Sequence, residues 1–173
     1  MKSIFIIVTV LITSFCHGQL QFEGEISSLH KTLELENGEI KILKYNSKDK
    51  TLFIYNTDQS LWKKIILPLP KFHLLDEVKH ISTGVLNNDE KLEIIYSCLE
   101  YITPDEYDDV SFEHEFIDYT LNIINEDGQI LLICKGSKDF KLINTQSSRK
   151  LLIYQNYFED NLRKTKTLIY KIK

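Results

Sequence analysis

The stretch TLFIYNTDQSLWKKI, residues 51–65, decides the fold because a similar stretch, TLNIINEDGQILLIC, follows at residues 120–134. The positions identical in both copies are Thr51 and Thr120, Leu52 and Leu121, Ile54 and Ile123, Asn56 and Asn125, and Asp58 and Asp127. In each copy, two apolar runs flank a polar turn whose Asn and Asp side chains can hydrogen-bond the nearby backbone. The sequence therefore predicts two β-hairpins of the same kind.

The similarity continues beyond these hairpins. KLEIIY at residues 91–96 corresponds to KLLIYQ at residues 150–155. We therefore predict an internal duplication with units of about four strands, covering about residues 51–98 and 120–157. Chance similarity between two hairpins is the alternative explanation.

The rest of the chain shows short apolar runs separated by turn residues. Asn37-Gly38, between HKTLEL and EIKILKY, is a strong hairpin signal. The pattern predicts an all-β, antiparallel fold of about eleven strands. TLFIY, QILLI and LLIY are apolar on both sides, so we expect sheets covered on both faces. A propeller-blade-like stack of small sheets fits this pattern, and a β-sandwich is the alternative.

Residues 1–18 have the layout of a secretory signal peptide. Lys2 precedes an apolar run over residues 4–12, and the small residues Cys16 and Gly18 precede a cleavage site after Gly18. Residues 19–173 are then a single β-rich domain, and we predict no transmembrane segment after cleavage. A retained membrane anchor is the alternative.

The signal peptide predicts export to the periplasm or the extracellular space. Lipid attachment through Cys16 is a second route to the cell envelope. The bulky Phe15 beside this cysteine disfavours it.

The charge of the chain disfavours binding to nucleic acids. With 21 basic and 25 acidic side chains, the net charge is −4 at neutral pH, which repels phosphate backbones. A basic cluster near the C-terminus is the local exception. It consists of Arg163, Lys164, Lys166, Lys171 and Lys173. The alternation with Leu168 and Tyr170 favours the solvated face of a last strand over a site for polyanions.

Cys98 and Cys134 remain after cleavage, and both lie in strand-like runs. In an oxidising compartment they can form a disulfide. Alternatively, they are free thiols that pack as small apolar groups.

The segment 102–118 holds the densest group of charges. Its carboxylates are Asp105, Glu106, Asp108, Asp109, Glu113, Glu115 and Asp118. Bound calcium would relieve their mutual repulsion, and the candidate ligands are Asp105, Asp108, Asp109, Glu113 and Glu115. The spacing differs from that of an EF-hand, and a solvated hairpin loop is the favoured interpretation, with calcium binding as the alternative.

Several phrases of the chain resemble the β-rich repeat region that precedes a type IX secretion sorting tail in secreted flavobacterial proteins. They are SLWKKIILPLP at 60–70, VLNNDEKLEIIYS at 85–97, IINEDGQILL at 123–132, KLLIYQNYF at 150–158 and KTLIYKI at 166–172. The resemblance implies no enzymatic activity. Such proteins continue into the sorting tail, whereas this sequence stops at Lys173, so we expect periplasmic export as readily as type IX secretion.

These observations favour an exported, non-catalytic β-rich module that binds a partner or has a structural role at the cell envelope. No familiar nucleophile motif, metal-ligand spacing or phosphate-binding loop is present. The sequence leaves the partner open. A protein and a glycan are candidates, since aromatic side chains could line a groove, although most of them lie in strands where aromatics are ordinary packing residues. One alternative is a divalent-metal-dependent hydrolase using residues 104–115, with His114. Another is an inhibitor or immunity protein.

Overall fold

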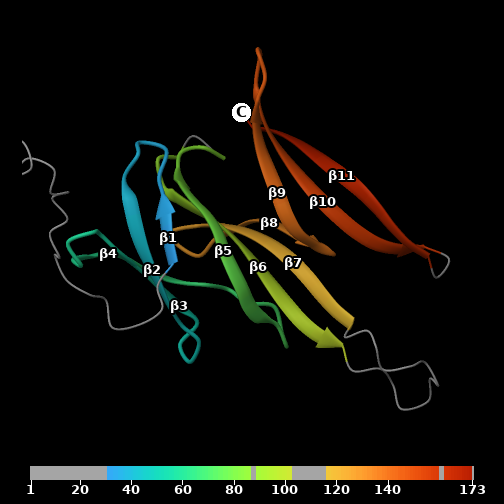
Figure 1. Cartoon of the computed structure of the whole chain (residues 1–173), viewed down its shortest axis with the longest axis horizontal. Coiled ribbons are helices and arrows are strands. Elements are labelled where there is room, and N and C mark those ends of the chain that lie inside the picture. The colour runs from blue at the N-terminus through green and yellow to red at the C-terminus, as the bar shows by residue number, and fades with distance from the viewer. Residues whose placement is uncertain (1–30, 87–88, 103–115, 160–161, 173) are drawn as a thin grey trace, which may run out of the picture.

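The computed structural model describes residues 31–86, 89–102, 116–159 and 162–172. These residues form eleven strands and no helix, which confirms the all-β prediction (Figure 1). The strands are β1 (Lys31–Glu34), β2 (Ile40–Asn46), β3 (Thr51–Tyr55), β4 (Leu61–Ile66), β5 (Leu74–Thr83), β6 (Leu92–Ile102), β7 (Phe116–Asn125), β8 (Ile130–Lys135), β9 (Ser137–Asn144), β10 (Arg149–Glu159) and β11 (Leu162–Ile172). Within the described ranges, no helix is long and apolar enough to cross a membrane.

The strands form three consecutive antiparallel sheets. The first sheet has the order β1-β2-β3-β4, the middle sheet β5-β6-β7-β8, and the last sheet β11-β10-β9. Each sheet is a simple meander, because each strand pairs with its neighbour in sequence. Short turns join β1 to β2, β2 to β3, β3 to β4, β7 to β8 and β9 to β10, as expected from the Asn, Asp and Gly residues between the apolar runs. The connection from β6 to β7, residues 103–115, lies outside the described residues.

The middle sheet is covered on both faces. Successive side chains of a strand point to opposite sides of the sheet, and β6 buries side chains on both sides. Ile94 and Tyr96 of β6 pack in a cluster shared with the first sheet. Ile95 of the same strand packs in a second cluster, shared with the last sheet. Both clusters consist mainly of Leu, Ile and Val, so two separate hydrophobic cores hold the three sheets together.

Burial on both faces was predicted for three runs, and the structure corrects this for QILLI. Ile130, Leu131 and Ile133 are exposed, because this run lies at the start of β8, the edge strand of the middle sheet. In LLIY, Leu151 and Ile153 are buried whereas Tyr154 is 43% exposed. An apolar sequence therefore does not distinguish a central strand from an edge strand.

The two similar stretches occupy corresponding places. The first forms β3, a turn and β4, and the second forms β7, a turn and β8. The amide of Asn56 donates to the Ser60 carbonyl at 2.9 Å, and the amide of Asn125 donates to the Gln129 carbonyl at 3.0 Å. The unit over residues 51–98 thus contains the second half of the first sheet and the first half of the middle sheet. The duplication itself stays a prediction.

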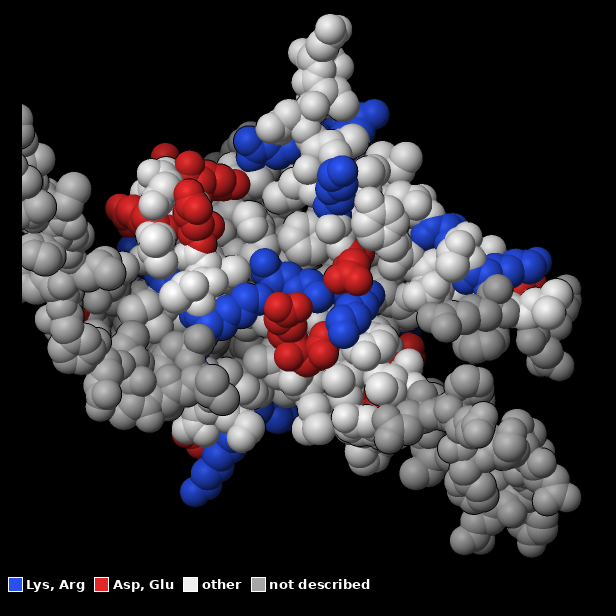
Figure 2. All heavy atoms as spheres, viewed as in Figure 1, with Lys and Arg blue, Asp and Glu red and all other residues white. Residues whose placement is uncertain are grey.

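A network of ion pairs connects the three sheets at one edge. Lys31 of β1 contacts Glu77 of β5 at 2.5 Å, and Lys79 contacts Glu77 at 2.9 Å and Asp139 of β9 at 3.0 Å. Hydrogen bonds from Lys31 and Lys79 lower the pKa of Glu77 to about 2. Figure 2 shows basic and acidic side chains side by side across the middle of the face of the molecule that is turned to the viewer.

Gly136 joins the middle and last sheets directly. Its amide donates to the Tyr119 carbonyl and its carbonyl accepts from the Asn156 amide, each at 2.7 Å. Its φ of 69° favours glycine, and a Cβ atom here would lie 2.1 Å from the Asn156 carbonyl oxygen. Only glycine lets the two backbones approach this closely.

Candidate functional site

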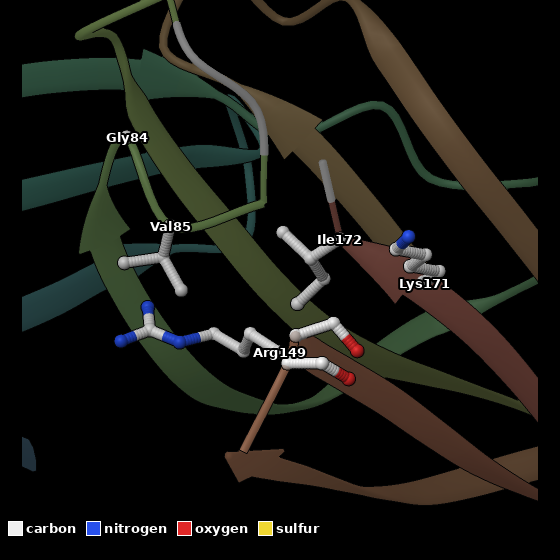
Figure 3. A pocket seen from close by; sticks show the side chains of 7 residues that line it. Gly84, Val85, Arg149, Lys171 and Ile172 are labelled. Atoms are coloured by element: carbon white, nitrogen blue, oxygen red, sulfur yellow. The ribbon is translucent and has the colours of Figure 1, made fainter. Parts of the chain in front are cut away.

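A surface cleft of about 530 Å³ lies where the middle and last sheets meet. Its lining residues are Gly84, Val85, Ser147, Ser148, Arg149, Lys171 and Ile172. They come from the loop after β5, the turn between β9 and β10, the first residue of β10 and the end of β11. Figure 3 shows the guanidinium of Arg149 beside Val85. Ile172 lies between Val85 and Lys171 in the same view (Figure 3).

One wall of the cleft is held in place by a buried carboxylate. Glu93 of β6 is fully buried. It accepts hydrogen bonds from the Ser82 hydroxyl at 2.8 Å, the Val85 amide at 2.9 Å and the Leu86 amide at 2.8 Å. A buried carboxylate requires such donors, and the loop amides would otherwise lack an acceptor. Glu93 therefore fixes the position of Val85 in the wall.

The opposite side is built on the turn from β9 to β10. The Thr145 hydroxyl donates to the Ser148 carbonyl at 2.6 Å and accepts from the Ser148 amide at 3.1 Å. Next in sequence, Arg149 donates from Nε to Asn144 Oδ1 at 2.9 Å. These local hydrogen bonds order the turn and position the base of the guanidinium.

The positive charge of the cleft is only weakly compensated. Glu36 Oε1 lies 3.9 Å from a terminal nitrogen of Arg149, and both side chains are 40% exposed, so this pair contributes little. Lys171 lies directly opposite Lys150 in the register of β10 with β11, where like charges repel. Within the described ranges, neither lysine forms an ion pair with a carboxylate.

His80 of β5 adds an uncharged group near Arg149. Burial lowers the pKa of His80; the Arg149 charge lowers it further, whereas Glu36 and Glu93 oppose the shift. Its ring packs against Phe140 at a centroid distance of 6.0 Å. Its buried Nε2 has no hydrogen-bond partner within the residues that the structure describes. The neutral imidazole leaves Arg149 and Lys171 as the charges of the cleft.

The residues predicted to bind calcium lie outside the described residues. These are Asp105, Asp108, Asp109, Glu113 and Glu115, and His114 of the hydrolase alternative lies there too. The calcium site therefore stays a prediction. In the part of the chain that the structure describes, no three His, Cys, Asp or Glu side chains converge to hold a metal.

Cys98 and Cys134 are both free and buried, so the disulfide considered from the sequence is not formed. Cys98 belongs to the core between the first and middle sheets, and Cys134 to the core between the middle and last sheets. The middle sheet therefore separates them. Burial, with a smaller effect of the Asp76 charge, raises the pKa of the Cys98 thiol to about 12, which makes it unreactive.

Sequence reasoning missed the cleft because its residues are far apart along the chain. The one available signal was Lys171, a member of the predicted basic cluster. Comparison with models of protein families, with curated proteins and with solved structures found no match. The function is therefore argued from the geometry of the cleft.

Proposed function

We propose that the chain is an exported, non-catalytic β-rich module that binds an anionic group of its partner in this cleft. The observation that carries the proposal is the lining itself. Arg149, Lys171 and two serines surround an opening whose described lining contains no carboxylate. Guanidinium and ammonium groups are the usual protein partners of carboxylate, sulfate and phosphate groups.

The chemistry of the cleft supports binding rather than catalysis. A serine nucleophile needs an adjacent base, and the described hydrogen bonds give Ser148 only Thr145 as a side-chain partner. The pKa of His80 is lowered by burial, and its ring packs on Phe140. An anion could be held here by charge and hydrogen bonding without any proton transfer.

Export and an internal duplication belong to the same proposal. The signal-peptide layout of residues 1–18 supports delivery to the periplasm or the extracellular space. The matching positions of the two hairpins in successive sheets support an origin by duplication. A stack of sheets with a cleft at the junction is a rigid support for binding an external anionic partner.

We test the proposal with inorganic phosphate as the probe, at constant ionic strength set with sodium chloride. Phosphate at ten times its Kd stabilises the folded state by about 1.4 kcal/mol, which raises Tm by roughly 3–6 °C for a domain of this size. Arg149→Gln should abolish this rise. Lys44→Gln is the matched control, because Lys44 is an exposed cation on the first sheet.

Differential scanning calorimetry measures the rise in Tm with phosphate for wild type and both variants. The proposal requires that wild type and Lys44→Gln respond alike and that Arg149→Gln does not respond. An equal rise in all three proteins would place the anion elsewhere and contradict the proposal. No rise in wild type with phosphate, sulfate or acetate would also overturn it.

A further inference from the structure

The last sheet has an open edge at the place where the other two sheets have a strand. β3 is the third strand of the first sheet in chain order, and β4 pairs with its outer side. β7 is the third strand of the middle sheet, and β8 pairs with its outer side. β11 is third in the last sheet and pairs with β10 on one side. Within the described part of the chain, no strand pairs with its other side (Figure 1).

This edge differs from the other sheet edges in length and regularity. β4 and β8 have six residues each, and their pairing contains register shifts at Ile54/Tyr55 and Ile123/Ile124. Short, bulged edges resist the addition of further strands. β11 has eleven residues and an unbroken register with β10 from Leu162 to Ile172. In an antiparallel pair, alternate residues direct their N–H and C=O groups away from the partner strand. The open side of β11 therefore presents a long, regular row of backbone groups.

The charge of β11 decides which strand could pair with it. Its sequence LRKTKTLIYKI contains four basic residues and no acidic residue. Pairing with a second copy of β11 would bring two edges together that carry basic and no acidic residues, and like charges across a strand pair repel. Lys164 already pairs with Glu159 of β10, whereas Lys166 and Lys171 form no ion pair within the described ranges. An acidic extended segment would place carboxylates opposite these two cations. Leu162 at the start of β11 and Ile169 between Lys166 and Lys171 are each 64% exposed and offer apolar contacts.

From this geometry we infer that β11 is a docking edge, on which an extended acidic segment of a partner protein adds as the fourth strand of the last sheet. Main-chain hydrogen bonds would supply affinity and the cations would select the acidic sequence. The inference goes beyond the anion cleft and does not require it, because it stands on strand order, backbone geometry and the charge of β11.

The probe is a fluorescein-labelled, eleven-residue peptide of alternating Glu and Val, measured with the folded protein by fluorescence polarisation. The matched control peptide has the same sequence with every backbone amide N-methylated, so its charge is equal but neither of its edges can donate a main-chain hydrogen bond. We expect the control peptide to bind at least about tenfold more weakly, because strand addition depends on those donors. Equal binding of the two peptides would reduce the interaction to charge alone and overturn the inference.

Two protein variants locate the binding. Lys166→Glu reverses a charge in the middle of β11 and should weaken peptide binding, whereas Lys44→Glu on the first sheet should not. Arg149→Gln should retain the peptide, which separates this result from that of the cleft. Undiminished binding by Lys166→Glu, with an unchanged thermal midpoint, would contradict the inference. So would a wild-type dimer, by sedimentation equilibrium, that Lys166→Glu dissociates, because a second copy would then occupy the edge.

Discussion

Glu93→Ala is expected to lower the free energy of unfolding by about 3–5 kcal/mol, because it leaves several buried donors without an acceptor. The amides of Val85 and Leu86 and the hydroxyl of Ser82 all donate to this carboxylate. Water entering the space left by the side chain would recover only part of these hydrogen bonds. The measurement is urea unfolding, followed by the fluorescence of Trp62, the one tryptophan of the chain.

Two further variants separate the carboxylate from the general cost of a substitution. Glu93→Gln keeps the shape of the side chain and one acceptor oxygen, so it should lower the free energy of unfolding by less than Glu93→Ala does. Glu34→Ala, at an exposed position of β1, should change stability by no more than about 0.5 kcal/mol. If Glu93→Ala were as mild as Glu34→Ala, Glu93 would not hold the wall of the cleft.

Ile94→Ala and Ile95→Ala are each expected to lower the free energy of unfolding by about 2–5 kcal/mol, although the two residues are adjacent and point in opposite directions. Both are fully buried, Ile94 against the first sheet and Ile95 against the last. In a sheet with one wet face, only one of two neighbours would be this sensitive.

Ile133→Ala is the matched control, because Ile133 of β8 in the same sheet is 45% exposed. In the same urea titration, Ile133→Ala should lower the free energy of unfolding by much less than Ile94→Ala or Ile95→Ala. A near-neutral Ile95→Ala would show that the last sheet does not cover the middle sheet in solution. A near-neutral Ile94→Ala would show the same for the first sheet.

The hairpins could be predicted from sequence because their determinants are local. Asn56 and Asn125 each begin a turn whose hydrogen bonds lie within five residues, so matching letters produce matching geometry. The apolar runs likewise predicted strands. They did not predict position in the sheet, since the apolar residues of β8 are at an edge.

The cleft and the state of the cysteines could not be predicted, because both depend on how the sheets pair and stack. Cys98 pairs with Thr120 and Cys134 with Leu121, which are neighbours on β7 and face opposite sides. A register change of one residue would have placed both thiols on the same face. The approach of Gly84, Arg149 and Lys171 similarly requires the middle and last sheets to be in contact.

Residue-resolved amide hydrogen exchange tests the stacked arrangement of the three sheets most directly. The account predicts that the paired amides of β6 and β7 exchange most slowly, near the free energy of global unfolding, because these central strands are covered on both faces. The amides of β4, β8 and β11 should exchange faster, since these strands lie at sheet edges. Exchange of β6 or β7 as fast as that of β11 would contradict the account.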